Sequence, residues 1–214
     1  MNSDQIIYYS ERAKEYEQIY QKEERQEDLK KLGIILKDLF FAKSVLEIAC
    51  GTGYWTRIIS EKAKSIFAVD INDSVLEIAQ SKKYKAPVNF EKADIFNISK
   101  VDEIFDSGFG GFIWSHIPKQ NLDVFLSGFL SKVSPGGLVV FVDNQYVEGS
   151  NSPIDSKDLY GNTYQLRKLS NKNSYKVMKN FPTDKEILEI VSPVSTQLKI
   201  DRLKYFWILK FRIK

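Results

Sequence analysis

The 214-residue sequence contains very little cysteine and histidine, with Cys50 and His116 as the single residues of each kind. A lone cysteine cannot form an internal disulfide, and one histidine beside it leaves too few soft ligands for a Cys/His zinc site. We therefore expect no disulfide and no zinc centre.

The sequence also lacks long apolar runs and an excess of charge of either sign. No segment approaches the ~20 continuous apolar residues that cross a bilayer, and the N-terminal residues, MNSDQIIYYSERAKEYEQ, are too polar for a secretory signal. The 31 basic and 28 acidic residues leave a net charge of +3, without the concentrated Lys and Arg of nucleic-acid binders. We expect a cytoplasmic protein with no membrane span and no strong nucleic-acid signature.

What the sequence does contain is typical of one globular domain. Hydrophobic residues make up 43% and charged residues 28% of the chain, which is the ordinary balance of such domains. No internal repeat and no long Pro/Gly/Ser-rich linker divides it. The length then favours a single domain over residues 1–214.

Helical and strand-like patterns alternate through the first two thirds of the chain. Tyr9, Tyr16 and Tyr20 recur at helical spacing over 3–20, and an amphipathic pattern over 25–40 predicts a second helix. Strands are then expected at 44–49, 65–69, 88–93, 111–114 and 138–142, and helices at 54–59, 75–81 and 122–133. This alternation predicts a parallel sheet.

After residue 150 the pattern changes. Two β-rich runs, 163–169 and 174–178, predict an inserted β-hairpin. Thr183 and Glu186 have the spacing of a capping box for a helix over 183–190. The two last runs, 196–203 and 205–213, are expected to form an antiparallel strand pair at the sheet edge.

A glycine turn follows the first expected strand, in the segment VLEIACGTG over 45–53. Gly51 and Gly53 permit positive φ and a close approach of a ligand to the backbone. The following helix directs its N-terminal amides at this turn, which suits a carboxylate or a phosphate. The third glycine of the nicotinamide fingerprint G-x-G-x-x-G is replaced by Thr56, so that pattern is incomplete.

Acidic residues accompany the turn. Glu47 lies inside the first strand, and Asp70 ends the second strand, where a carboxylate can accept hydrogen bonds from both ribose hydroxyls. With Ala49 at the first glycine, the segment resembles the acidic-x-G-x-G-x-G motif of class I S-adenosylmethionine-dependent methyltransferases. The pair Asp94-Ile95 after the third strand resembles the same family's adenine-binding element.

This resemblance implies an α/β fold of the doubly wound, Rossmann-like type. Its seven-stranded, mostly parallel sheet has the order 3-2-1-4-5-7-6, helices on both faces and an antiparallel last strand pair, here with the small inserted β-hairpin. We expect an N-terminal helical cap (1–42), a cofactor-binding core (43–145), a substrate-side insert (146–182), and a helix with terminal strands (183–214).

The resemblance also implies S-adenosyl-L-methionine as cofactor and S-adenosyl-L-homocysteine as product. The leading helix with Tyr8, Tyr9, Arg12 and Tyr16 would fold over the cofactor as a lid, and simple helix packing is the alternative. The expected cofactor-binding residues are Tyr9, Arg12, Glu47, Ala49, Gly51, Gly53, Trp55, Asp70, Ile71, Asp94, Ile95 and Trp114.

His116 is the candidate catalytic residue, since removal of a proton from a hydroxyl or ammonium acceptor needs a group of near-neutral pKa. It follows the expected fourth strand, beside the switch point where substrates bind in this fold; a polar loop residue that caps the next helix is the alternative. Arg167 suits a substrate carboxylate or phosphate, or it faces solvent. The expected acceptor-binding residues are Tyr8, Tyr16, His116, Asn144, Tyr146 and Arg167.

Asp143-Asn144 resembles two of the three ligands of metal-dependent O-methyltransferases. The place of the third ligand holds Trp114-Ser115-His116, so we expect no magnesium site.

The predicted function is methyl transfer to a small organic acceptor, on oxygen, nitrogen or carbon, by a monomer or homodimer. The motifs of DNA amino-, base C5- and protein arginine methyltransferases are not found. Two alternatives stay open. Gly51, Gly53 and Asp70 also fit an NAD(P)-dependent oxidoreductase, and the fold also occurs in noncatalytic binding proteins, because fold does not fix function.

Overall fold

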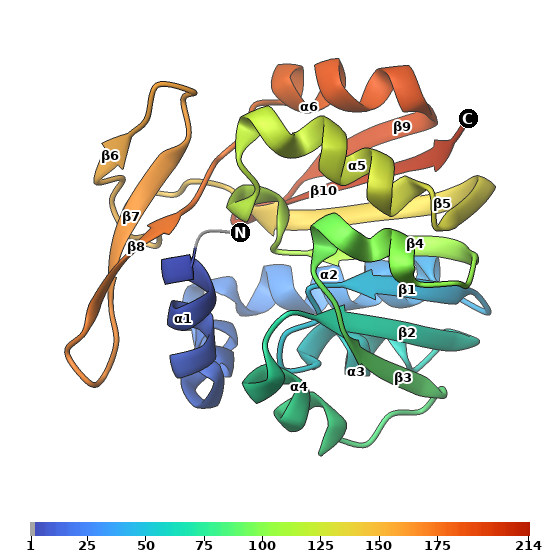
Figure 1. The fold of residues 1–214 in the computed structure, drawn as a ribbon, viewed down its shortest axis with the longest axis horizontal. Coiled ribbons are helices and arrows are strands. Elements are labelled where there is room, and N and C mark those ends of the chain that lie inside the picture. Colours follow the sequence, from blue (N-terminus) through green and yellow to red (C-terminus); the bar gives the residue numbers. More distant parts are fainter. Residues whose placement is uncertain (1–2) are drawn as a thin grey trace.

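The computed structural model describes residues 3–214, so the first two residues of the expected cap lie outside the described residues. A seven-stranded sheet in the order β3-β2-β1-β4-β5-β10-β9 forms the centre of the molecule (Figure 1). Its strands are β1 (Ser44–Ile48), β2 (Ser65–Asp70), β3 (Val88–Lys92), β4 (Phe105–Gly111), β5 (Val133–Asn144), β9 (Ser195–Arg202) and β10 (Phe206–Ile213).

The first five strands are parallel, whereas β10 lies between β5 and β9 and is antiparallel to both. The expected strand order and the antiparallel last pair are therefore confirmed. The α-helices are α1 (Ser3–Glu11), α2 (Gln26–Leu39), α3 (Tyr54–Ile59), α4 (Asp73–Gln80), α5 (Leu122–Leu130) and α6 (Asp184–Val191).

Helices cover both faces of the sheet because successive side chains of a strand point to opposite faces. In β1, Leu46 and Ile48 pack with the residues of α5 and α6, whereas Val45 packs with those of α2 and α3. The sheet is therefore buried on both sides, as expected for a doubly wound fold.

The fourth strand differs from the prediction of residues 111–114. It ends at Gly111, and Trp114–His116 form a short 3-10 helix, η4. Its glycines have low strand propensity, so the sequence pattern does not indicate a strand there. Packing nevertheless requires these glycines. A Cβ on Gly108 would lie 2.6 Å from the Phe129 ring, and one on Gly110 would lie 2.6 Å from the Phe141 ring.

The leading helix is also interrupted. The α1 helix ends at Glu11, and the chain continues as a 3-10 helix, η1 (Ala13–Gln21). This tighter winding places Tyr20 in a stacked arrangement on Tyr54, with ring centroids 3.9 Å apart. The prediction of one continuous helix was wrong, because aromatic spacing alone does not distinguish an α-helix from a 3-10 helix.

The predicted hairpin of the insert is confirmed as β7 and β8, and a short further strand, β6, extends it to a three-stranded antiparallel sheet in the order β6-β7-β8. Its strands are β6 (Ser156–Lys157), β7 (Thr163–Lys168) and β8 (Ser174–Met178). Figure 1 shows this small sheet beside α1, beyond one end of the main sheet. The predicted capping box of α6 is confirmed, with Thr183 and Glu186 bonded reciprocally. Within residues 3–214, no helix is long and apolar enough to cross a membrane.

Candidate functional site

The glycine turn after β1 is built from residues of left-handed backbone. The φ angles are 51° at Ala49, 55° at Gly51 and 76° at Gly53. A Cβ on Gly51 would meet nothing within 4 Å, whereas one on Gly53 would lie 2.4 Å from the Tyr84 hydroxyl. Gly51 thus leaves open space above the turn, and Gly53 allows the turn to pack closely against Tyr84.

Asp70 lies directly against this turn. One carboxylate oxygen accepts a hydrogen bond from the Gly51 amide at 2.9 Å, and the other accepts from the Asn72 amide at 3.0 Å. Burial raises the pKa of Asp70, and these amides oppose that shift. The carboxylate keeps further lone pairs for hydroxyl donors, because a carboxylate accepts up to about four hydrogen bonds.

Glu47 is buried beneath the turn. Burial raises its pKa to about 8; the Thr56 hydroxyl opposes this shift, and Asp70 adds to it. A carboxyl group in this setting is protonated at neutral pH, so Glu47 adds no full negative charge to the turn.

A small cavity of about 70 Å³ lies over the turn. The Asp70 carboxylate and the Gly51 backbone form its floor, and α1 closes it with Gln5, Ile6 and Tyr9. The remaining lining residues are Tyr16, Ala49, Ile71, Asn72, Val75, Gly111, Phe112, Ile113 and His116.

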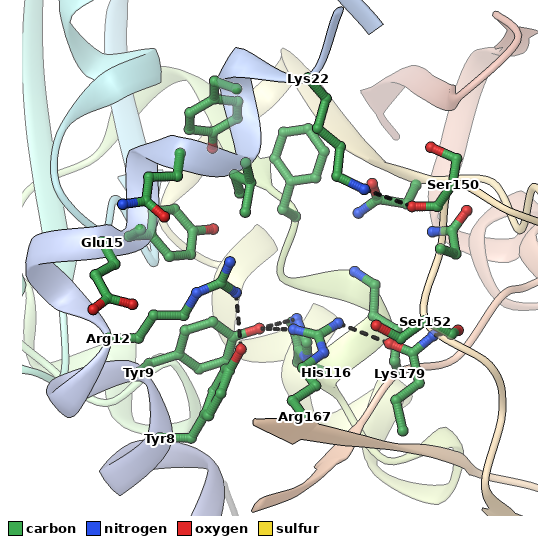
Figure 2. A pocket seen from close by; sticks show the side chains of 18 of the residues that line it. Tyr8, Tyr9, Arg12, Glu15, Lys22, His116, Ser150, Ser152, Arg167 and Lys179 are labelled. Atoms are coloured by element: carbon green, nitrogen blue, oxygen red, sulfur yellow. Dashed lines mark hydrogen bonds between the residues drawn. The ribbon is translucent and has the colours of Figure 1, made fainter. Parts of the chain in front are cut away.

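A larger cavity of about 400 Å³, whose lining is drawn in Figure 2, shares lining residues with the small one. Tyr9, Tyr16, Phe112 and His116 line both cavities and form the wall between them. Phe112 has a positive φ of 61°, which is strained for a bulky residue.

Basic side chains dominate the larger cavity. Arg25 and Lys179 are buried, and Arg12 and Arg167 are half-buried. Lys22 and Lys168 also line it, against Glu15 as the acidic lining residue. Among residues 3–214, no ion pair involves Arg12, Arg25 or Arg167.

The arginines are instead held by neutral groups. Arg25 donates to the Asn144 amide oxygen at 3.2 Å and to the Ser150 hydroxyl at 2.8 Å. Arg167 donates to the Gln165 side chain at 2.9 Å and to the Tyr9 hydroxyl at 3.3 Å. Their positive charge is therefore not neutralised by the protein.

His116 lies at the centre of the site, in the wall between the cavities. Its Nδ1 is 2.6 Å from the Met178 carbonyl, and its Nε2 is 2.8 Å from the Tyr9 hydroxyl. Burial lowers the pKa of His116 well below its usual value, and the nearby positive charges of Lys179 and Arg167 lower it further. The ring is therefore neutral at pH 7.

A buried ion pair supports this histidine. Lys179 lies 2.8 Å from Asp143 and 2.5 Å from the Ser115 hydroxyl, and Asp143 also accepts from the Ser115 amide at 2.9 Å. The lysine lowers the pKa of Asp143. Asp143 thus belongs to an ion pair, and residues 3–214 contain no group of three or more His, Cys, Asp and Glu side chains that could hold a metal ion.

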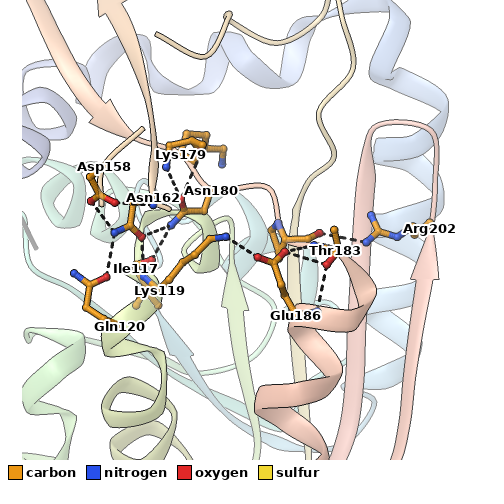
Figure 3. Close-up of polar contacts among 12 residues, drawn as sticks. Ile117, Lys119, Gln120, Asp158, Asn162, Lys179, Asn180, Thr183, Glu186 and Arg202 are labelled. Atoms are coloured by element: carbon orange, nitrogen blue, oxygen red, sulfur yellow. Dashed lines mark hydrogen bonds and ion pairs between the residues drawn. The ribbon is translucent and has the colours of Figure 1, made fainter. Parts of the chain in front are cut away.

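Asparagines hold the small sheet against the loop that carries His116 (Figure 3). The Asn180 side chain donates to the Ile117 carbonyl at 3.1 Å and to Asn162 at 3.2 Å, and Asn162 accepts from the Lys119 amide at 2.8 Å. Both asparagines are buried. This network fixes Met178 and Lys179 beside the histidine.

The structure brings together most of the residues expected from sequence. Of the expected cofactor residues, Tyr9, Ala49, Gly51, Asp70 and Ile71 line the small cavity. Of the expected acceptor residues, Tyr8, Tyr16, His116, Asn144 and Arg167 line the larger one, and Arg12 lies with them.

The other expected residues line neither of these cavities. Asp94 accepts from the Phe96 amide and caps a 3-10 helix that starts at Ile95. Trp114 packs on Phe141 and Trp207, and Tyr146 packs on Phe181. Glu47 is buried beneath the turn, Gly53 belongs to the turn and packs against Tyr84, and Trp55 donates to the Tyr20 hydroxyl.

Sequence reasoning missed Arg25, Phe112 and Lys179. Arg25 precedes a helix and Lys179 follows a strand of the insert, so neither lies in a recognisable motif. The apolar sequence around Phe112 resembled a strand interior, which concealed its position at the cavity wall.

Comparison with known proteins assigns the fold and its glycine turn to a family. A family model described as a methyltransferase domain matches residues 45–137. The chain is similar to the solved DhpI–SAM–HEP complex, with a TM-score of 0.81 and 25% identity, over 98% of this chain and 96% of that chain. Residues 45–137 thus match the methyltransferase domain family, and the chain as a whole has the fold of a class I S-adenosylmethionine-dependent methyltransferase.

Curated relatives match a shorter part of this chain. An uncharacterised methyltransferase of Anoxybacillus flavithermus is 24% identical over 103 residues, which are 48% of each chain. A malonyl-[acyl-carrier protein] O-methyltransferase of Serratia marcescens is 26% identical over 101 residues, which are 46% of this chain and 37% of the relative. The chain thus spans less than half the length of these relatives.

Proposed function

We propose that this methyltransferase binds S-adenosylmethionine at the glycine turn and transfers its methyl group to a small organic acceptor in the larger cavity. The observation that carries the proposal is the shared wall of the two cavities. A methyl donor on one side and an acceptor on the other meet there, and in-line displacement needs alignment above all.

The residues of the small cavity fit the cofactor. Asp70 offers acceptor lone pairs for ribose hydroxyls, and the open space above Gly51 allows a ligand to reach the backbone. When bound, the cofactor supplies an electrophilic methyl group on a sulfonium. The protein's part is to bind, orient and exclude water.

The larger cavity favours an acceptor that carries a carboxylate or phosphate group. Arg12, Arg25 and Arg167 have no carboxylate partner among the described residues, and half-buried guanidinium groups pair well with planar or tetrahedral oxyanions. An anion in this cavity would neutralise charge that the protein leaves uncompensated. We assign Arg167 to this anion because its guanidinium donates to the Tyr9 hydroxyl of the shared wall, which in turn contacts His116.

Calorimetric titration with S-adenosylmethionine, S-adenosylhomocysteine and NAD(P)H tests the cofactor assignment. We expect micromolar binding of the first two and at least a tenfold loss of affinity in Asp70→Ala. Asp106→Ala is the matched comparison and should bind as the parent protein does, because its exposed carboxylate bonds Ser44 and lines neither cavity. Unchanged affinity in Asp70→Ala would remove Asp70 from the site.

A screen of acceptors tests the substrate class. Hydroxy acids, phosphate monoesters, phosphonates and neutral alcohols are each incubated with S-adenosylmethionine, and S-adenosylhomocysteine is measured. We expect turnover of anionic acceptors and a KM at least tenfold higher in Arg167→Gln. Lys176→Gln removes a positive charge from β8 outside the cavity and serves as control. Cofactor binding without turnover of any acceptor would favour a noncatalytic binding protein.

A further inference from the structure

We propose that the Tyr9 hydroxyl relays the acceptor's proton to His116, so that the catalytic base of this methyltransferase is a tyrosine–histidine pair contributed by α1 and η4. The inference rests on the proposed methyl-transfer function. It deepens that function by assigning the proton's path.

The direction of the hydrogen bonds decides which atom of His116 is basic. The Met178 carbonyl can only accept, so Nδ1 at 2.6 Å carries the ring proton. In a neutral ring this leaves Nε2 as the unprotonated nitrogen. The Tyr9 hydroxyl, 2.8 Å from Nε2, is therefore the donor of that bond.

Tyr9 consequently covers the basic nitrogen of His116. Its ring packs edge-on against the imidazole, with centroids 5.3 Å apart. An acceptor in the larger cavity can reach Nε2 only after Tyr9 is displaced, whereas it can reach the hydroxyl of Tyr9 without disturbing the pair.

The Tyr9 oxygen retains a lone pair for this task. A phenolic hydroxyl has one donor and two acceptor lone pairs. The proton is directed at His116, and one lone pair receives the Arg167 guanidinium at 3.3 Å. The other lone pair is left for an acceptor O–H or N–H, and Figure 2 shows Tyr9, His116 and Arg167 converging in the cavity.

Each bond that forms in the proposed step is matched by one that breaks. The acceptor's oxygen or nitrogen forms a bond to the methyl carbon, and the S–CH₃ bond breaks with its electron pair on sulfur. The acceptor's proton passes to Tyr9 as the Tyr9 proton passes to Nε2. His116 leaves the step as a cation, which later releases the proton to water.

The charges around His116 fit this role. Lys179 and Arg167 disfavour its cation, Asp143 favours it, and burial keeps the resting ring neutral. Burial also raises the pKa of Tyr9, with Arg167 opposing the shift. Tyr9 is thus a protonated donor at rest, as a relay requires.

Because the sequence has a single histidine, the protonation of its two ring nitrogens can be measured directly. In protein labelled with ¹⁵N-histidine, His116 is the source of every imidazole signal. We expect the Nδ1–H form at pH 7, and a shift of the Nε2 resonance in Tyr9→Phe but not in Tyr164→Phe. Tyr164 is a matched control because its hydroxyl bonds Asp158, away from both cavities. An Nε2–H form, or an Nε2 resonance unmoved by Tyr9→Phe, overturns the proposal.

Kinetics with the best acceptor of the screen test the relay itself. We expect Tyr9→Phe to lower kcat by about 10²-fold or more, because the variant keeps the ring and loses only the hydroxyl. Because the pair acts as a unit, the Tyr9→Phe/His116→Gln double variant should be no slower than His116→Gln alone. A Tyr9→Phe protein with unchanged kcat overturns the relay even though methyl transfer stands. If no acceptor is turned over, the proposed function fails while the ¹⁵N spectra still decide the hydrogen-bond direction.

Discussion

Buried acids at the glycine turn show how much a single residue's environment determines its charge. Burial raises the pKa of both Glu47 and Asp70, but backbone amides oppose the rise at Asp70, whereas the pKa of Glu47 reaches about 8. The acidic position of the motif therefore holds a neutral carboxyl group at neutral pH. This difference is invisible in the sequence, where both residues are simply acidic.

The raised pKa of Glu47 predicts a pH-dependent stability. Its folded pKa of about 8 lies above an unfolded value near 4.3. Its contribution is therefore complete below that unfolded value and is lost as pH rises toward 8, by up to about 1.4 kcal/mol per pH unit. We expect Glu47→Gln to have a higher Tm than the parent protein at pH 8.5. The difference should shrink or reverse at pH 4.5, as measured by thermal unfolding in matched ionic strength.

Asp106→Asn is the control for this measurement. Its carboxylate is largely exposed and its pKa is lowered by the Ser44 amide and hydroxyl, so its stabilising effect should be lost at acid rather than alkaline pH. A Tm difference between Glu47→Gln and the parent that does not change with pH would contradict the burial of a neutral carboxyl group.

At the residue scale, the predictable part of the site was the part encoded in contiguous motifs. Gly51 and Asp70 lie in one strand–turn–helix–strand unit whose two strands are parallel neighbours, so their proximity could be predicted. Arg25 and Lys179 reach the cavity through tertiary packing between segments far apart in the chain, which no local pattern records. His116 was identified by its rarity, but its orientation depends on Met178, a residue of the insert.

At the element scale, α1 closes the small cavity. Its residues Gln5, Ile6 and Tyr9 line a space of about 70 Å³, whereas ligand pockets usually measure about 300–1,000 Å³. Entry or exit of a nucleoside-sized cofactor therefore requires α1 to move. Contacts to the small sheet hold α1 in place, with Glu11 accepting from Tyr175 at 2.8 Å and from Asn171 at 3.1 Å.

Loosening α1 should therefore speed cofactor release. We expect Tyr175→Phe, which removes the hydroxyl that holds Glu11, to raise the dissociation rate of S-adenosylhomocysteine by roughly two- to fivefold. Stopped-flow displacement measures this rate. Tyr164→Phe removes a hydroxyl from the same sheet without touching α1 and should release the product at the parent rate. Equal rates in all three proteins would show that this contact does not limit the movement of α1.

The elements themselves were predictable where their periodicity was strong. The alternation through β1, β2 and β3 gave correct strands because buried parallel strands are short apolar runs bounded by turns. The prediction failed at β4, where packing against Phe129 and Phe141 demands glycines that propensity assigns to loops. It also missed β6, whose two residues lie in a polar stretch.

At the scale of the whole molecule, charge is distributed unevenly. The net charge is only +3, and the sequence therefore gave no reason to expect an anion site beyond Arg167. Folding nevertheless brings six Lys and Arg residues from three parts of the chain around one cavity, with Glu15 among them. These residues are Arg12, Lys22, Arg25, Arg167, Lys168 and Lys179.

This concentration of basic residues predicts that salt weakens binding of an anionic acceptor but not binding of the cofactor product. Exposed charges are screened beyond about 10 Å at 0.1 M salt, and Lys22 and Lys168 are exposed at the cavity rim. We therefore expect the KM of an anionic acceptor to rise severalfold between about 20 and 300 mM NaCl, because salt weakens electrostatic attraction to the cavity. The Kd of S-adenosylhomocysteine, measured in the same buffers, should change less than twofold, since its cavity is lined by Asp70 and mostly uncharged groups. A neutral acceptor from the same screen is the internal control. A KM that is independent of salt for an anionic acceptor, with Arg167→Gln equally insensitive, would mean that the basic residues do not bind the acceptor.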